Sequence, residues 1–430
     1  MSITVPQEEL VKPTAHRVIL PFYIYSALSF LIATSLLFFS SESVTQHFFN
    51  PKLLAITHTI ALGWGTMMIL GASHLLVPVL IQGKLYSTAL AYTSFVFAAS
   101  GIPILAYHFY YFDFGWMTQL GALLINAAVM VYVINLAMSM IKSKKENVHA
   151  AFIFTAALWL LITTMLGLLL VCNFVDPLLP QNSTYYLSLH ANIGIVGWFL
   201  LLIIGVGSRL IPMFLVSKYS NASLLWVIYA LINFSLLLFF FLFLYWPFST
   251  WYFIPVAAIF VAIFLFMFYC YQCFKSRIRK KIDEQLKSSL LSVLLMGISI
   301  LVLITLIAGY TLSHATNTVF ALLYGFVVFF GWLTVLIFGM TFKTLPFIIW
   351  DKVYQVQSGK GTTPNPKSLF SSRIFTMMVL VYLSGFLMFA IGIFFASNTL
   401  LKIASFFLLV SALLYNWNVF KTILHKKIKP

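Results

Sequence analysis

Charged residues are scarce in this sequence. Asp and Glu supply only 9 of its 430 residues, charged residues of all kinds make up 8%, and hydrophobic residues make up 62%. A water-soluble fold would have too little polar surface to cover itself with this composition. In a bilayer, apolar runs of about 20 residues form helices that satisfy their own backbone hydrogen bonds. We therefore predict an all-α, polytopic membrane protein in which 1–430 form one membrane domain and the lipid bilayer is the main partner.

Cysteines and paired carboxylates are also few. Cys172, Cys270 and Cys273 lie in or at the ends of apolar runs, and the one Cys-x-x-Cys pair lacks the second pair that a zinc or cluster site needs. We interpret these cysteines as packing residues. No Ser-His-Asp arrangement or phosphate loop stands out, which disfavours the catalysis of soluble enzymes. The net charge of +16 comes from short loops and tails, so it indicates membrane topology and no nucleic-acid partner.

Twelve apolar runs predict twelve membrane helices. With a cytoplasmic N-terminus, all but Lys52 and Lys402 of the 25 basic residues fall on the cytoplasmic side, as the positive-inside rule requires. We therefore place the chain in a bacterial inner membrane with both termini in the cytoplasm, and we interpret 359–367 as a solvated linker. The expected helices are 18–40, 54–80, 86–108, 115–141, 150–172, 186–214, 223–245, 250–273, 287–311, 317–345, 373–396 and 400–421.

A four-residue pattern recurs in the second, sixth and tenth expected helices. It reads Gly-Trp-x6-Gly-x6-Pro, and the offset from the first copy to the second equals the offset from the second to the third. This period predicts three repeats of four helices, at about 13–146, 147–280 and 281–421. The glycines would allow close helix approach, the tryptophan would fill the space between helices, and the proline would mark the cytoplasmic helix end. The copies are Gly63, Trp64, Gly71 and Pro78; Gly197, Trp198, Gly205 and Pro212; and Gly331, Trp332, Gly339 and Pro346.

Two histidines interrupt these apolar helices. His58 lies five residues before the first Gly-Trp pair, where the other copies have Asn192 and Phe326, and His190 lies two residues before Asn192. Polar side chains within membrane helices are costly, so they mark candidate functional sites, although either histidine could be a hydrogen-bonded packing residue. The predicted topology places both in the outer half of the membrane.

The remaining histidines suggest weaker hypotheses. His74 lies sixteen residues after His58, too far along the helix to share one iron with it, and the matching regions contain Arg209 and Lys343. We interpret these three residues as snorkelling or lipid-facing. A surface copper or zinc site on the outer side is conceivable, although ordinary solvent-facing histidines are favoured there; its candidates would be His47, His108 and His314.

This pattern resembles a known family. Twelve helices with a cytoplasmic N-terminus, three four-helix units and an outer histidine on the second helix are similar to subunit I of the haem-copper oxidases. The second helix is most similar to that of the nitric oxide reductase and cbb3-type branch. This resemblance implies that His58 is the axial ligand of a b-type haem, and that cytochrome c-type or other respiratory subunits are partners. The residues that carry it are His58, Thr59, Trp64, Gly71, Ala72 and 75–78.

The sequence also departs from that family. Its tenth helix supplies one histidine to each haem and its seventh helix supplies a copper-binding pair, but 317–345 and 223–245 contain none. A three-histidine copper site cannot be built from these helices, so we do not expect copper. Only His190 lies on the helix of the first copper ligand, and it remains a candidate ligand for a metal, or for a haem shared with His58.

Two functions follow from these observations. The first is a haem-binding protein of respiratory electron transfer, gas sensing or oxidase assembly that lacks a complete haem-copper site; if it is an enzyme, it is an oxidoreductase. The alternative is a transporter or channel for a small neutral solute or gas. The cores of 54–80, 186–214 and 317–345 contain no Asp or Glu, which disfavours ion-coupled transport.

Overall fold

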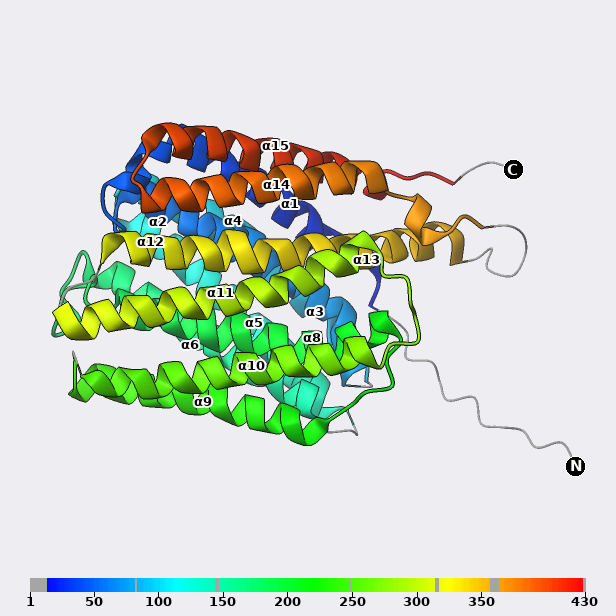
Figure 1. The fold of residues 1–430 in the computed structure, drawn as a ribbon, viewed down its shortest axis with the longest axis horizontal. Helices are drawn as coiled ribbons and strands as arrows, with labels where there is room; N and C mark the ends of the chain where they lie inside the picture. The colour runs from blue at the N-terminus through cyan, green and yellow to red at the C-terminus, as the bar shows by residue number, and fades with distance from the viewer. Residues whose placement is uncertain are drawn as a thin grey trace, which may run out of the picture.

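The protein is a single bundle of membrane-length helices (Figure 1). The computed structural model describes residues 14–427 except 82, 144–146, 248, 314–316 and 356–362. Within that part, twelve helices are long and apolar enough to cross a membrane. The all-α fold class and the helix count are therefore confirmed. Part of the expected linker at 359–367 lies outside the described residues.

Three of the twelve membrane helices are each built from three consecutive segments. The second combines α2 (Pro51–His58), η2 (Thr59–Thr66) and α3 (Met67–Leu80); the sixth combines α7 (Leu187–Asn192), η3 (Ile193–Leu200) and α8 (Leu201–Leu215); the tenth combines α12 (Thr318–Phe326), η5 (Val327–Leu333) and α13 (Thr334–Tyr354). The others are α1 (His16–Phe39), α4 (Thr88–Tyr110), α5 (Trp116–Ile141), α6 (Val148–Asn173), α9 (Ala222–Tyr245), α10 (Phe253–Lys275), α11 (Glu284–Ser313), α14 (Ser372–Phe394) and α15 (Asn398–Ile423).

Most helix ends lie within a few residues of the expected positions because polar capping residues interrupt the apolar runs. Asn50, for example, accepts a hydrogen bond from the backbone N–H of Leu53 and starts α2. The tenth helix is the exception. Pro346 lies inside α13, which continues to Tyr354, so the expectation that this proline marks the helix end is wrong.

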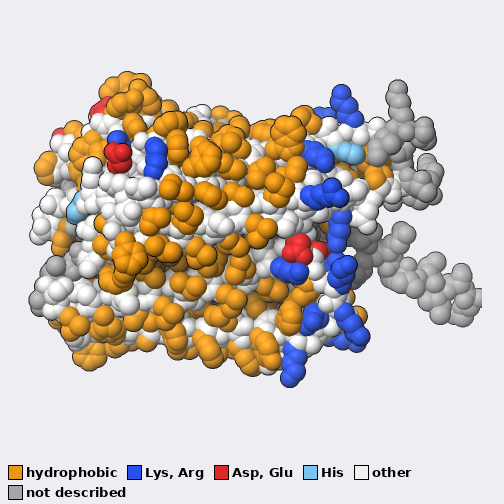
Figure 2. All heavy atoms as spheres, turned by 45° about the horizontal axis from the view of Figure 1, so that its top comes forward, with side chains coloured by type: hydrophobic (Ala, Val, Ile, Leu, Met, Phe, Trp, Pro, Cys, Tyr) orange, Lys and Arg blue, Asp and Glu red, His pale blue; other side chains and the backbone are white. Residues whose placement is uncertain are grey.

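Lys and Arg side chains gather at one end of the bundle, which we call the basic end (Figure 2). It includes residues at or just beyond the ends of the even-numbered membrane helices. The chain enters α1 and leaves α15 at this same end, and α1 packs against α15. The first and last helices are therefore neighbours. Representative residues of the basic end are Lys218, Arg277, Lys352 and Lys421.

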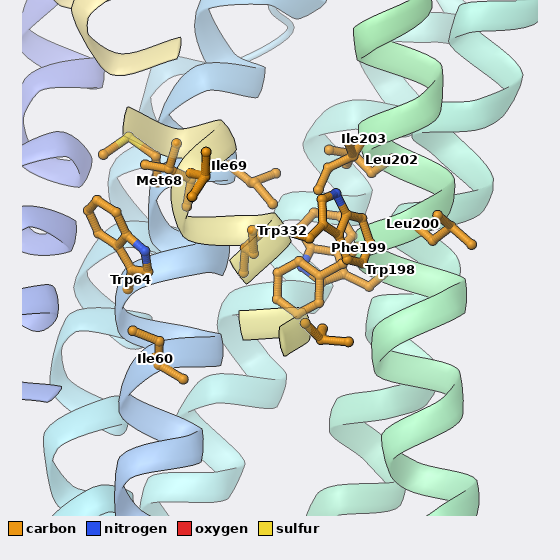
Figure 3. Packing of buried hydrophobic residues seen from close by; sticks show 14 of the residues in the cluster. Ile60, Trp64, Met68, Ile69, Trp198, Phe199, Leu200, Leu202, Ile203 and Trp332 are labelled. Carbon is orange, nitrogen blue, oxygen red and sulfur yellow. The ribbon is translucent and has the colours of Figure 1, made fainter. Parts of the chain in front are cut away.

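Each Gly-Trp pair lies in a π-helical segment. These segments, η2, η3 and η5, begin at Thr59, Ile193 and Val327, which are spaced as the Gly-Trp pairs are. They meet at the centre of the bundle, where the buried side chains of Trp64, Trp198 and Trp332 are among those that fill the space (Figure 3).

Glycine is required where the three segments touch. A Cβ atom at Gly65 would lie 2.8 Å from Leu333 and 3.1 Å from Phe199, so a larger residue would push the segments apart. Positions 65, 199 and 333 share the spacing of the Gly-Trp pairs. Equivalent positions of the three segments therefore converge on one point.

Two indole hydrogen bonds join these segments. Trp64 Nε1 donates to Thr334 Oγ1 at 3.0 Å, and Trp198 Nε1 donates to Thr66 Oγ1 at 3.1 Å. The equivalent acceptor position for Trp332 is Leu200, and Trp332 Nε1 is buried without a hydrogen-bond partner. The junction of the sixth and tenth helices therefore lacks the bond that the other two junctions have.

Replacing each tryptophan by phenylalanine removes similar volume but a different number of hydrogen bonds. Trp64→Phe and Trp198→Phe should each destabilise the protein by about 1 kcal/mol more than Trp332→Phe, because only the first two lose a buried bond. Thermal unfolding of the detergent-solubilised variants measures the difference. Equal losses in all three would show that the indole bonds contribute nothing.

A carboxylate at the basic end holds several segments together. Asp283 Oδ2 lies 2.6 Å from Lys343 Nζ on α13, 3.1 Å from Lys367 Nζ and 3.3 Å from Arg279 Nη2. Its other oxygen accepts the backbone N–H of Leu286 in the first turn of α11. Burial alone would raise the pKa of Asp283, but the hydrogen bond and charge of Lys343 outweigh it and lower the pKa from 3.8 to about 2.

Asp283→Asn should destabilise the protein at neutral pH by about 3 kcal/mol, because it leaves the buried Lys343 ammonium without its carboxylate. The Asp283 pKa is lower in the folded state, so its contribution is complete above pH 4 and is lost as the pH falls toward 2. Chemical unfolding at pH 7 and pH 3 should therefore show a smaller difference from wild type at pH 3. Glu284→Gln, which breaks only an exposed pair with Lys287, is the matched control and should change stability by less than about 1 kcal/mol.

Candidate functional site

His58 is the last residue of α2, directly before the π-helical segment. Its Nδ1 lies 2.8 Å from the carbonyl oxygen of Leu54. A carbonyl can only accept, so Nδ1 carries the proton of the neutral ring, and Nε2 keeps a free lone pair. Phe109 packs edge-on against the imidazole, with 4.8 Å between ring centroids. This is the tautomer and support that a histidine ligand needs.

His190 faces His58 from α7. Their ring centroids are 6.3 Å apart and the ring planes differ by 21°. Nδ1 of His190 is buried without a well-formed hydrogen bond, and the backbone of Thr163 is the group beside the ring that can partner it. The structure therefore brings together the two histidines that the sequence singled out, although three membrane helices separate them along the chain.

Helix register explains why they meet. Thr66 and Trp198 join the second and sixth membrane helices through their hydrogen bond. His58 lies eight residues before Thr66, and His190 lies eight residues before Trp198. Because these two helices run in the same direction, both imidazoles lie at the same height above that bond. In the repeat alignment, His190 lies two positions earlier than His58. The donor Trp198 likewise lies two positions earlier than the acceptor Thr66, so the two shifts cancel.

Both histidines line a cavity of about 160 Å³. The second to sixth membrane helices and Phe329 of the tenth line it. Trp198 and Phe199 lie near the bundle centre (Figure 3), and Phe329 packs against Phe199. Thr57 and Ala191 also line it and are exposed, which marks its mouth at the end opposite the basic end. None of the residues that line the cavity is charged.

Three hydroxyl groups in the cavity wall are already engaged. Thr66 accepts the bond from Trp198, Thr163 donates to the carbonyl of Trp159, and Thr164 donates to the carbonyl of Leu161. The imidazoles, with the hydroxyl of Thr57, are therefore the polar groups that remain for a ligand in this apolar space. The sequence patterns did not point to Thr66. A comparison of the repeats two positions after each Gly-Trp pair would have found it, together with Thr334.

The tenth helix has a phenylalanine at the repeat counterpart of His58. Phe326, at the matching position, stacks on Phe389 and Phe386 with centroid distances of 4.5 and 5.3 Å. Aromatic side chains thus pack around the repeat counterpart of His58. His58 instead opens into the cavity that it shares with His190.

The assignment of His74 and Lys343 to the lipid-facing surface is wrong. His74 is buried against Phe22 and Tyr132, and its Nε2 has no hydrogen-bond partner. Lys343 is buried in its ion pair with Asp283. Hydropathy cannot distinguish a polar residue that faces lipid from one that faces a neighbouring helix. Arg209, by contrast, is exposed.

The other outer histidines do not join the cavity. His108 pairs with Asp113 at 2.8 Å, and His47 is exposed. His314 lies outside the described residues. In the part of the chain that the structure describes, no three His, Cys, Asp or Glu side chains are grouped to hold a metal ion. The candidate surface copper or zinc site therefore has no support among these residues.

The fold is similar to that of a heme-copper terminal oxidase of known structure. A heme-copper terminal oxidase, whose dimer was solved by cryo-EM, matches 96% of this chain and 85% of its own chain with a TM-score of 0.68. The two sequences are 10% identical, so the likeness shows the fold alone. No family model and no curated protein sequence matches this chain.

An unpartnered buried nitrogen is costly, so His190 should lower the stability of the cofactor-free protein. His190→Leu is expected to raise its unfolding free energy by about 1 kcal/mol. His149→Leu, which removes imidazole contacts to Gly205 and Ser208, should lower it. Denaturation of the two cofactor-free variants distinguishes a functional His190 from a packing one; destabilisation by His190→Leu would contradict the expectation.

Proposed function

We propose that this chain, which has the fold of a heme-copper terminal oxidase, binds one haem through His58. The observation that carries the proposal is the free Nε2 lone pair of a hydrogen-bonded imidazole on the wall of an apolar cavity. Haem binding needs an axial ligand and an apolar slot, and this site offers both.

The ligand set suits a haem better than a bare ion. Protein sites for single transition-metal ions take three or four side-chain ligands, whereas the cavity offers two imidazoles. A porphyrin supplies four nitrogens, so one or two histidines complete its iron. An enclosed volume of about 150 Å³ holds a benzene-sized guest. Residues at the open side of the cavity, such as Thr57 and Ala191, would therefore also help to hold a haem.

The residues around His58 have definite tasks in this proposal. Leu54 orients the imidazole through its carbonyl, Phe109 restricts the ring, and the apolar walls exclude water. When bound, a haem supplies one-electron chemistry. We assign the chain to respiratory electron transfer, or to a related sensing or assembly role, without a copper centre. If it is an enzyme, it is an oxidoreductase.

The same proposal includes the family branch, the membrane orientation, the internal repeats and the partners of this chain. We place the chain nearest the nitric oxide reductase and cbb3-type branch, in a bacterial inner membrane with both termini cytoplasmic. The segregation of Lys and Arg at the basic end supports this orientation. The regular offset of η2, η3 and η5 supports three internal repeats. A cytochrome c-type protein or another respiratory subunit would approach from the opposite end, where the cavity opens.

A second candidate function uses the cavity without a haem. Its walls carry no charge and its mouth is exposed, which suits a small neutral solute or a gas. Flux of such a molecule into proteoliposomes, compared with protein-free liposomes, tests this candidate. No difference in flux would remove it.

Purified protein should show a haem spectrum, with the b type identified as its pyridine haemochrome. His58→Ala should lose most of the haem, because it removes the proposed axial ligand. His74→Ala is the matched control: it removes a buried histidine of the same membrane helix outside the cavity and should keep wild-type haem content. Haem-free wild-type protein from haem-replete cells, or full retention in His58→Ala, would refute the proposal.

A further inference from the structure

We infer that His190 is the second axial ligand, so that imidazoles from the second and sixth membrane helices fill both axial positions of one iron. This inference rests on the proposed haem site at His58. It differs from the arrangement implied by the family resemblance, in which the tenth helix supplies the second ligand.

The separation of the two rings fits this role. Two metal–nitrogen bonds of about 2 Å, placed end to end with an imidazole at each end, give ring centroids roughly 6 Å apart. The observed centroid distance is 6.3 Å, and the planes differ by 21°. A direct hydrogen bond between the two rings is not present.

The surroundings of His190 leave it free for a ligand. The backbone of Thr163 is the hydrogen-bonding group beside one ring nitrogen, the hydroxyl of Thr163 is engaged with the carbonyl of Trp159, and the other ring nitrogen is left for a ligand. Gly167 makes room for the ring, because a Cβ atom there would lie 3.0 Å from Cε1 of His190.

Double ligation determines what this site can do. With His58 and His190 both bound, no axial position is open to oxygen, nitric oxide or carbon monoxide. The site would then carry electrons without activating a gas. The register between Thr66 and Trp198, which sets the two histidines at one height, would position both ligands.

The experiment compares haem-loaded wild type, His190→Ala and His74→Ala by ferric EPR and by the optical spectrum of the ferrous form with carbon monoxide. Wild type and His74→Ala should be low-spin and unreactive with carbon monoxide. His190→Ala should become high-spin and bind it. Added imidazole should enter the vacated space and restore the low-spin signal.

Each result decides a separate point. A high-spin or carbon monoxide-reactive wild type, or a His190→Ala protein that stays low-spin, would overturn the role of His190 and leave His58 as the haem ligand. If His190→Ala loses its haem, recovery in imidazole supports the role and failure to recover overturns it. Wild-type protein with no haem would remove the proposed function itself.

Discussion

The hydrogen bond from Trp198 to Thr66 sets the geometry on which the candidate site depends. It joins the second and sixth membrane helices at the inner end of the cavity. Because each histidine lies eight residues before its own member of this pair, the bond brings His58 and His190 to one level. Gly65 permits this junction, since a side chain there would collide with Phe199 and Leu333.

The three thirds of the chain make similar contacts at the bundle centre, but the side chains around those contacts differ. Beside the second and sixth helices it leaves an apolar cavity with two imidazoles. Beside the tenth helix, the stack of Phe326, Phe386 and Phe389 fills the corresponding space. A fold shared with an oxidase therefore does not imply the same cofactor positions, because function depends on the side chains placed on a fold.

Much of the fold could be predicted from the sequence because hydropathy and capping residues act locally. Asn50 illustrates this: one polar residue before an apolar run starts α2. Sequence-based prediction fails where the environment of a residue depends on residues that are distant in the sequence. Lys343 looks like a snorkelling residue until Asp283, sixty positions away, is known to meet it. Likewise, the sequence singled out His58 and His190 separately, but their pairing depends on the register between two helices.

The cluster around Asp283 also bears on how the protein is made. Asp283 leaves the ribosome sixty residues before Lys343 and eighty-four before Lys367. During that interval Arg279 is the one ion-pair partner of Asp283 already synthesised, while the hydrogen bond from the backbone N–H of Leu286 can form locally. Arrival of the tenth helix provides Lys343 and allows burial. These ion pairs therefore hold the start of α11 against α13 and the segment before α14 only once the tenth membrane helix is in place.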